Sequence, residues 1–535
     1  MIKRIKITII GTMLCLCLLA YNIFNISAGN SDVSVNLTVN QRDNSILLNS
    51  CRGVIYDRNM QPLAGKELKN GVLVDPLKLT SEEIELLFEN AENISKETLS
   101  EKINSGYPFY CTLKENISSD GFISIGTMSR YSKSRIAQNL FGYIDSDGNG
   151  VGGVEEFFNS LLKTDMEYRV SYNTDAMGQI LDGLGLSFSG PANGANHGIV
   201  LSIDKTIQEI CEKAADDSFE KGAIVVQDVS SGNIVANVSR PNFDPYDIEK
   251  YLSVDGAFLN KTMEEYCCGS AFKIAVTAAA LENSDEINFS YNCTGHYNAG
   301  GIKIGCGNTD GHGLLTLKTA FAKSCNTYFC SLAQQLGAEK VYEMAEKMGF
   351  GSASRLGCGL FGKSGQLPLM RDLSTPAALA NFSIGQGSLL VTPIQVSNMT
   401  NIIANGGSYY DPLLVLGYTE NGRNINSKES SASHRVISDK TAKEIQNLME
   451  YTVLYGTGIN AAPVAYGAGA KTSTAETGIY SDGVQVYHTW VTGFVPANTP
   501  KYTITVLVEG GESGYYNAAP VMKKIADGLI AAGLY

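Results

Sequence analysis

The sequence opens with a long apolar run. The cations Lys3, Arg4 and Lys6 come first, and the chain then carries no charge from residue 7 to residue 31. This uncharged stretch is long enough for a helix that crosses a bilayer. Residues 1–30 are therefore predicted to form a cytoplasmic tip and a transmembrane anchor, with the positive charges keeping the N-terminus inside. A cleaved signal peptide is the alternative, because Ser27-Ala28-Gly29 is typical of a processing site.

Residues 31–196 combine alternating and helical patterns. The first part alternates like an exposed strand or an extended linker. An acidic amphipathic helix is predicted at 81–90, and a Gly- and Asp-rich turn at 145–153. No catalytic residue types gather here, so this region is predicted to be a linker followed by a non-catalytic, mixed α+β domain.

Residues 197–535 have strands at both ends and a helical middle. Residues 223–229 and 234–238 flank Ser230–Asn233 and predict a hairpin. Near the C-terminus, three more strands precede a helix that opens at Pro520. The predicted strands are 466–477, 486–495 and 502–509. This order predicts one α/β domain whose sheet is closed by its own C-terminus.

Charge and cysteine content narrow the function classes. The 535 residues carry a net charge of -13, and no basic run is present, so a nucleic-acid partner is excluded. None of the twelve cysteines forms paired CxxC units typical of zinc sites, and we expect neither a metal nor an organic cofactor. Cys293 and Cys306 bracket a Gly-rich loop and are a possible disulfide.

The sharpest candidate for chemistry is Gly269-Ser270-Ala271-Phe272-Lys273, which leads into an Ala-rich run that favours a helix. Residues three apart share a helix face, so Ser270 and Lys273 are expected to point the same way. A serine needs a neighbour to remove its proton, and a desolvated lysine can be neutral enough to do so. Alone, this S-x-x-K spacing is common, and a capped surface helix would explain it better.

Two later groups add chemistry of the same kind. In a helical run, Ser324 is suited to relay a proton, and Asn326 offers an amide to orient Lys273 or hold a substrate amide. On a predicted strand, Lys471-Thr472-Ser473-Thr474 places Lys471 and Ser473 on one face. As an edge strand it would bind an extended peptide, with Lys471 attracting a carboxylate. Taken singly, these groups are explained as a helix cap and a solvated strand.

The order S-x-x-K, S-x-N and a K-T-G-like strand is similar to the motif set of penicillin-binding proteins and related β-lactamases. Beyond the motifs, Arg52–Ala64, Ile384–Gln395 and His488–Pro496 resemble blocks of class B penicillin-binding proteins. The resemblance implies an α/β penicillin-binding transpeptidase domain, similar to serine β-lactamases, with a central antiparallel sheet and a helical subdomain. It would occupy residues 197–535, after a pedestal within residues 31–196.

The resemblance implies acyl transfer on peptidoglycan. Ser270 would attack the penultimate D-Ala carbonyl of a stem peptide and release the terminal D-Ala. An amine of a neighbouring stem would then resolve the acyl-enzyme and form a cross-link, and β-lactams would acylate Ser270 as substrate mimics. The other implied catalytic residues are Lys273 as general base, Ser324, Asn326 and Lys471. The implied substrate-binding residues are Thr472, Ser473 and Thr474, with the backbone N–H groups of Ser270 and Thr474 as the oxyanion hole.

Two positions depart from the family's pattern. Ser473 stands where the third motif usually has glycine, and its hydroxymethyl group would occupy space left for substrate or for the adjoining helix. Cys268 replaces the usual proline before Gly-Ser, which would loosen the turn that presents Ser270, and its thiol could be oxidised. The sequence leaves open whether these changes weaken activity or β-lactam affinity.

Two other functions stay open from the residues. One is a carboxypeptidase or β-lactamase of the same fold, but such a hydrolase needs a second base, and none is assignable after Ser324-Cys325-Asn326. The other is a catalytically weak scaffold or β-lactam sensor, which Ser473 and Cys268 keep open.

The resemblance also implies partners and a location. Elongation, division and sporulation are equally compatible with the sequence. The expected partners are peptidoglycan stem peptides, the membrane, and a polytopic glycosyltransferase of the shape, elongation, division and sporulation family. The chain would be a single-pass membrane protein with a cytoplasmic N-terminus and an extracytoplasmic catalytic domain.

Overall fold

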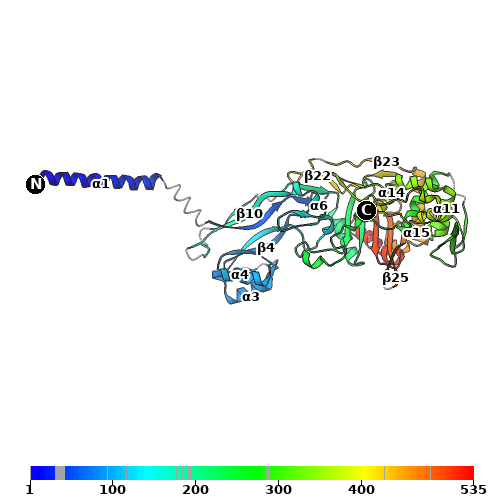
Figure 1. The fold of residues 1–535 in the computed structure, drawn as a ribbon, viewed down its shortest axis with the longest axis horizontal. Helices are drawn as coiled ribbons and strands as arrows, with labels where there is room; N and C mark the ends of the chain where they lie inside the picture. Colours follow the sequence, from blue (N-terminus) through cyan, green and yellow to red (C-terminus); the bar gives the residue numbers. More distant parts are fainter. Residues whose placement is uncertain are drawn as a thin grey trace. The chain divides into compact units, whose positions relative to one another are not determined.

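The structure is a computed structural model that describes all residues except 1, 30–42, 93, 116, 118, 120, 176–178, 182–184, 191–194, 285–288, 427 and 482. The chain forms two compact units (Figure 1). The first unit comprises Met1–Cys51, Glu67–Ser129 and Thr164–Gly194. The second comprises Arg52–Lys66, Arg130–Lys163 and Ala195–Tyr535. Most of the linker predicted after the anchor falls on residues 31–42, outside the described residues.

The predicted apolar segment is helix α1 (Ile2–Gly29). Its window Thr8–Asn25 has a mean hydropathy of 1.7, and the helix is long and apolar enough to cross a membrane. A helix of about 20 residues is what the hydrocarbon core requires. A secretory signal near the N-terminus has the same properties, so the choice between a retained anchor and a cleaved signal stays a prediction.

The first unit is a mixed α+β fold around an antiparallel sheet. Helix α3 begins after Thr80, whose side chain and that of Glu83 form a capping box, and it ends where the sequence pattern predicted. Leu87 and Leu99 bury the inner faces of α3 and α4 in a core with the four-stranded sheet. The helices are α3 (Ser81–Asn90) and α4 (Lys96–Ser105). The sheet has the order β5 (Ala91–Glu92), β6 (Phe109–Leu113), β4 (Glu67–Val74), β7 (Phe122–Ser129), and a second sheet has the order β1 (Asp43–Arg52), β10 (Lys163–Asn173), β11 (Ser187–Ser189).

The second unit is built on a five-stranded antiparallel sheet. The predicted hairpin forms β13 and β14, and the three C-terminal strands complete the sheet beside it. Val225 of β13 lies opposite Thr505 of β26, so the chain's own C-terminus closes the sheet as expected. Strand β24, which carries Lys471, lies at the edge. In sheet order the strands are β14 (Ile234–Arg240), β13 (Gly222–Asp228), β26 (Tyr502–Glu509), β25 (Val484–Val495) and β24 (Gly469–Ser481).

Helices cover both faces of this sheet because its strands alternate apolar side chains on two sides. Val506 packs in one core with α8 (Lys205–Asp216) and α16 (Ala519–Ala531). The next residue, Leu507, packs in the other core with the helical subdomain. The helices of that second core are α9 (Lys273–Glu282), α10 (Leu317–Ala322), α11 (Asn326–Leu336), α12 (Ala338–Lys347), α13 (Pro376–Ser383), α14 (Pro393–Ala404) and α15 (Asp439–Tyr455).

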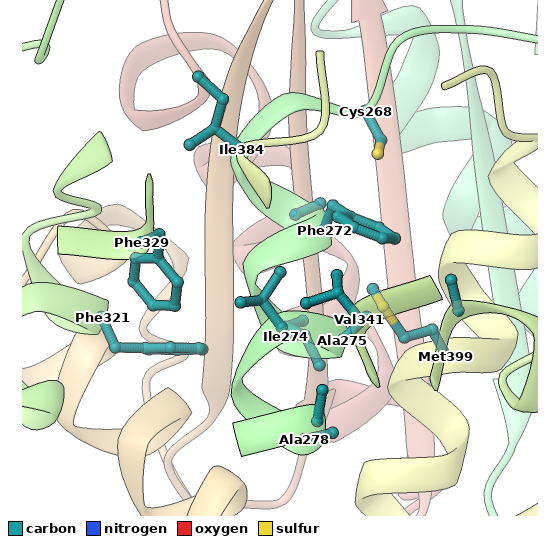
Figure 2. Packing of buried hydrophobic residues seen from close by; sticks show 14 of the residues in the cluster. Cys268, Phe272, Ile274, Ala275, Ala278, Phe321, Phe329, Val341, Ile384 and Met399 are labelled. Carbon is teal, nitrogen blue, oxygen red and sulfur yellow. The ribbon is translucent and has the colours of Figure 1, made fainter. Parts of the chain in front are cut away.

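Helix α9 is the centre of the helical subdomain. Its Ala-rich sequence lets neighbouring helices approach closely, and every residue from Lys273 to Ala280 is buried. Figure 2 shows Phe321 and Phe329 on one side of α9 and Met399 of α14 on the other, all within one core. The residues that follow Ser270 are therefore fixed by packing on several sides.

Two early segments of the chain pack with the second unit. Glu155 is fully buried and accepts from the guanidinium groups of Arg52 at 2.7 Å and Arg130 at 2.6 Å. Strand β2 also pairs in parallel with β12 of the same unit. The predicted boundary lies between residues 196 and 197. The ion cluster joins Arg52–Lys66 to Arg130–Lys163, and the strand pairing joins Arg52–Lys66 to residues after that boundary. The sheet involved has the order β22 (Val415–Thr419), β12 (Gly198–Leu201), β2 (Val54–Tyr56), β3 (Pro62–Ala64).

Candidate active site

The turn that carries Ser270, a 3-10 turn at Gly269–Phe272, is shaped by close backbone packing. The Gly269 N–H donates to the carbonyl of Gly385 at 2.9 Å. Gly269 has a φ of +52°, and a Cβ there would lie 2.6 Å from the Ser473 hydroxyl oxygen. Only glycine adopts this conformation in this space without strain. The glycine before Ser270 therefore sets where the serine enters the site.

The two positions that depart from the family pattern lie against each other. Ser473 is buried, and its hydroxyl donates to the Cys268 carbonyl oxygen at 2.7 Å. The indole N–H of Trp490 donates to the Cys267 carbonyl at 3.1 Å. Side-chain donors thus hold the turn at the place where the family has a proline. Burial raises the pKa of the Cys268 thiol well above its usual range, which makes it a weak nucleophile beside Ser270.

Lys273 begins helix α9 with a side chain that is 0% exposed. Its Nζ donates to the Ser324 carbonyl oxygen and to Asn326 Oδ1, each at 2.7 Å, and lies 3.4 Å from Ser324 Oγ. Burial lowers the pKa of Lys273 to about 8, because a buried ammonium loses its hydration. A neutral amine is therefore accessible near physiological pH.

Ser270 lies one helical turn before this lysine and faces open space. Its side chain is partly buried, and among the described residues its hydroxyl has no hydrogen-bond partner. Hydrogen bonds between a nucleophile and its base are often long without substrate and tighten when substrate binds. Ser270 therefore lines the cleft while Lys273 is buried, and the expectation that the two side chains point the same way stays a prediction.

Ser324 lies in the short connection between α10 and α11, not within a helix as the sequence pattern predicted, and Asn326 follows at the start of α11. Ser324 has a φ of +54°, which is uncommon for a residue with a side chain, and Asn326 is the first residue of α11. The side-chain amide of Asn326 makes two hydrogen bonds. Its oxygen accepts from Lys273, and its nitrogen donates to the Gly305 carbonyl at 3.1 Å. The amide is thus fixed as an acceptor for the lysine.

Lys471 reaches the same place from the edge strand. Its Nζ donates to Ser324 Oγ at 2.8 Å and to the Thr472 carbonyl at 2.8 Å, and the side chain is 0% exposed. Burial, and then repulsion by Lys273, hold the pKa of Lys471 well below its usual range. The ammonium expected to attract a substrate carboxylate is therefore buried. The Ser324 hydroxyl connects the two lysines and can pass a proton between them.

These groups border one cleft of about 1080 Å³. Thr474 is exposed and its Oγ1 accepts from the Gly514 N–H at 3.2 Å, while Thr472 Oγ1 bonds to Thr457 Oγ1 at 2.6 Å. A cleft along an edge strand suits an extended peptide bound through main-chain hydrogen bonds. The predicted site residues that line the cleft are Ser270, Ser324, Asn326, Thr472, Ser473 and Thr474, and the two lysines lie behind them.

The disulfide between Cys293 and Cys306 is the prediction that the structure does not support. All cysteines in the described residues are free thiols. Instead, the sulfurs of Cys293 and Cys306 lie 3.6 and 3.5 Å from Nδ1 of His312, which also lines the cleft. The sequence pattern missed His312 because its only signal is its position six residues after Cys306. Thr457, which bonds to Thr472, carried no signal either.

A serine, two desolvated lysines and a bridging hydroxyl on this α/β fold define an acyl-transferring serine enzyme. Residues 222–527 match the family of the penicillin binding protein transpeptidase domain. The chain therefore belongs to the transpeptidase family of penicillin-binding proteins, in its class B, and is a serine-type D,D-transpeptidase. The resemblance inferred from the motifs is confirmed, as is the predicted α/β fold class.

Relatives and solved structures cover most of the chain. Stage V sporulation protein D of Bacillus subtilis is 28% identical over 509 residues, which are 89% of this chain and 77% of that protein. Peptidoglycan D,D-transpeptidase FtsI of Escherichia coli K12 is 26% identical, over 90% of this chain and 84% of that protein. A chain in a peptidoglycan synthase complex that coordinates polymerization and crosslinking is 22% identical, with a TM-score of 0.68 and 98% of each chain covered. At this level of sequence identity, the similarity to that chain shows a shared fold.

Proposed function

We propose that this enzyme cross-links peptidoglycan by acyl transfer through Ser270. The Ser270 oxygen forms an ester with the penultimate D-Ala carbonyl of a stem peptide, and the bond to the terminal D-Ala breaks. An amine of a neighbouring stem then attacks the ester, which forms the cross-linking amide and frees the serine. The membership in the D,D-transpeptidase family and the peptide-sized cleft at Ser270 support this proposal.

Lys273 is the proposed general base, and its environment is the observation that carries the proposal. A lysine with a pKa of about 8 can accept the Ser270 proton and later return it to the leaving D-Ala amine. The hydrogen bonds from Nζ to the Ser324 carbonyl oxygen and to Asn326 Oδ1 fix the position of the amine. No other cationic side chain among the described residues lies both fully buried and next to Ser270 in sequence.

Ser324 and Lys471 are proposed to carry the proton between the two halves of the reaction. The Ser324 hydroxyl accepts from Lys471 at 2.8 Å and lies 3.4 Å from Lys273 Nζ. When Lys273 is protonated, Ser324 can donate to the leaving amine and be reprotonated from the lysine. Lys471 stabilises the Ser324 oxygen when it has given up its proton, through the hydrogen bond from Nζ or through a positive charge.

Strand β24 is the proposed substrate-binding edge. Thr472, Ser473 and Thr474 would hold the stem peptide along the cleft, and the backbone N–H groups of Ser270 and Thr474 would bind the oxyanion. A lost oxyanion donor costs about 100- to 1000-fold in rate in other acyl-transfer enzymes. Because the Ser473 hydroxyl points at the Cys268 carbonyl, this side chain stabilises the nucleophile turn and leaves the cleft open.

The proposed setting is the outer face of the cytoplasmic membrane. Helix α1 would stay as a single-pass anchor with the cations of its first turn in the cytoplasm, and the second unit would face peptidoglycan. A chain with this fold occurs in a complex that coordinates polymerization and crosslinking, so the proposed partner is a polytopic glycosyltransferase. β-Lactams are the proposed inhibitors, since the family is named for binding penicillin.

A transpeptidation assay tests this proposal. Full-length enzyme in detergent is given a donor stem that ends in D-Ala-D-Ala and a labelled acceptor amine, and both free D-Ala and the cross-linked product are quantified. We expect equal release of D-Ala and formation of product, and neither with Ser270→Ala. Release of D-Ala into water without product would indicate a carboxypeptidase, and no release from the native enzyme would refute the proposal.

A further inference from the structure

Four side chains of metal-binding types meet beside Ser324 and Asn326, the residues of the S-x-N motif. The donor atoms of Cys293, Cys306, His312 and Cys325 all lie within 4.8 Å of one another. They come from three separate places: the end of β15 (Tyr291–Cys293), the loop between β17 (Ile302–Gly305) and β18 (Gly313–Leu315), and the turn before α11. The three cysteines are buried and the imidazole is partly buried.

Three of the distances between these atoms match a tetrahedral zinc ion. With Zn–S bonds near 2.3 Å and Zn–N bonds near 2.05 Å, a regular tetrahedron places two sulfurs about 3.8 Å apart and a sulfur and a nitrogen about 3.6 Å apart. The Cys306 and Cys325 sulfurs are 3.8 Å apart. His312 Nδ1 is 3.6 Å from the Cys293 sulfur and 3.5 Å from the Cys306 sulfur.

The surrounding backbone is built to bring these donors together. Cys293 pairs with Gly313 across the β15–β18 ladder, which puts His312 beside it. The Cys306 N–H donates to the Gly295 carbonyl at 2.9 Å, so the loop of Cys306 lies on the strand end of Cys293. A Cβ at Gly295 would lie 1.9 Å from the Thr309 carbonyl oxygen. Only glycine permits that approach.

We propose that Cys293, Cys306, His312 and Cys325 bind one Zn²⁺ ion as three thiolates and one imidazole. Four protein ligands complete a tetrahedral site, which is the arrangement of structural zinc and leaves no position for a reacting water. This reverses the expectation of no metal, which rested on the lack of paired CxxC units. It also replaces the predicted disulfide, because a disulfide would leave the other thiol and the imidazole unused.

The ion would position the second catalytic motif. Cys325 lies between Ser324, which bonds both lysines, and Asn326, which bonds Lys273. Asn326 also donates to the carbonyl of Gly305, the neighbour of Cys306. A metal bound to both cysteines would therefore hold the positive φ of Ser324 and the Asn326 amide in place. This part of the inference rests on the proposed function, since it assigns those residues a role in acylation.

Metal content tests the site directly. The full-length enzyme is purified in detergent with a reductant and without chelator, and zinc is measured by plasma mass spectrometry. We expect about one zinc per chain, as in Cys₃His sites, and background zinc in Cys293→Ser and His312→Ala. Cys358→Ser is the matched control, because that thiol is partly buried and lies outside the cluster, and it should keep its zinc. Replacement of zinc by Co²⁺ should give thiolate charge-transfer absorption that Cys293→Ser lacks.

The coupling to catalysis is measured separately, as the rate of acylation by a fluorescent penicillin. Removal of zinc by a chelator should lower this rate about tenfold or more and re-addition should restore it, the scale seen when support around a metal site is lost. Background zinc in the native chain, with Ser270 still acylated, would overturn the metal site and leave the proposed function intact. Bound zinc in a native chain that is never acylated would support the metal site and overturn the proposed function. An unchanged rate in the zinc-free enzyme would overturn the positioning role.

Discussion

The charge state of Lys273 gives the most quantitative prediction. If the neutral amine accepts the Ser270 proton, acylation must rise with pH while Lys273 loses its proton. With a pKa of about 8, the neutral fraction and the rate should rise about tenfold for each pH unit below 8 and level off above it. The direction of the pKa shift follows from burial. Burial disfavours the ammonium form of Lys273, so the neutral amine exists at a lower pH than in an exposed lysine.

Asn326→Asp should move this profile. The change replaces a neutral oxygen 2.7 Å from Lys273 Nζ with a carboxylate of nearly the same shape. At an effective dielectric constant of about 20, Coulomb's law gives roughly 6 kcal/mol for that distance, and measured shifts beside an opposite charge are about one to three pKa units. A rise of about two units puts the inflection near pH 10 and lowers the rate at pH 7 about 100-fold.

Other titratable groups also face Lys273. The thiols of Cys306, Cys325 and Cys330, when ionised, favour its ammonium form, and Lys273 in turn lowers the pKa of Lys471 on β24. All of them are present in every variant compared. The predicted difference between Asn326 and its replacement therefore isolates the new carboxylate.

The assay is the second-order rate of acylation by a fluorescent penicillin between pH 6 and pH 11, corrected for alkaline hydrolysis of the drug. Asn326→Ala is the uncharged control, since it removes both hydrogen bonds of the amide without adding a charge, and it should slow acylation with no rise in the inflection. A native inflection in Asn326→Asp, together with a lower rate, would rule out Lys273 as the titrating base. A native rate that is flat through pH 8 would rule it out as well.

The remaining predictions concern the turn, the relay and the early segments. Gly269→Ala should slow penicillin acylation strongly, because its Cβ would meet Ser473 Oγ at 2.6 Å, and Ser473→Gly in the same chain should restore part of the rate. Ser324→Ala should lower the acylation rate about 100-fold, the scale of a lost proton-transfer partner, while the melting temperature changes little. Glu155→Gln should destabilise the protein by about 3 to 5 kcal/mol in denaturant unfolding, because it leaves two guanidinium groups without their buried carboxylate. An unchanged unfolding midpoint for Glu155→Gln would contradict that value.

Local patterns predicted the sheet and the helices because they carry most of the information about each element. The strand 502–509 followed from its strand-like residue pattern, and the helix at 81–90 followed from its acidic amphipathic pattern. The burial of Lys471 did not follow, because alternation gives the face of a side chain and not the element packed on it. The contact between Ser473 and Cys268 joins residues 205 positions apart, so no local pattern could reveal it.

The cysteine cluster shows the same limit. Pairs of cysteines with short spacing are the sequence signal for zinc, whereas these ligands are spread from Cys293 to Cys325 and meet through strand pairing. A loop between two cysteines suggested a disulfide because the position of His312 was unknown. Three-dimensional proximity, which the sequence does not state, changed that interpretation.

The most direct test of the account is the identity of the acylated residue. Full-length enzyme is incubated with penicillin, the adduct is measured by intact-protein mass spectrometry, and the modified peptide is sequenced by fragmentation. If Ser270 is the nucleophile, one adduct per chain forms on Ser270 and none forms in Ser270→Ala. An adduct on Cys268 or any other residue, or a labelled Ser270→Ala chain, would contradict it.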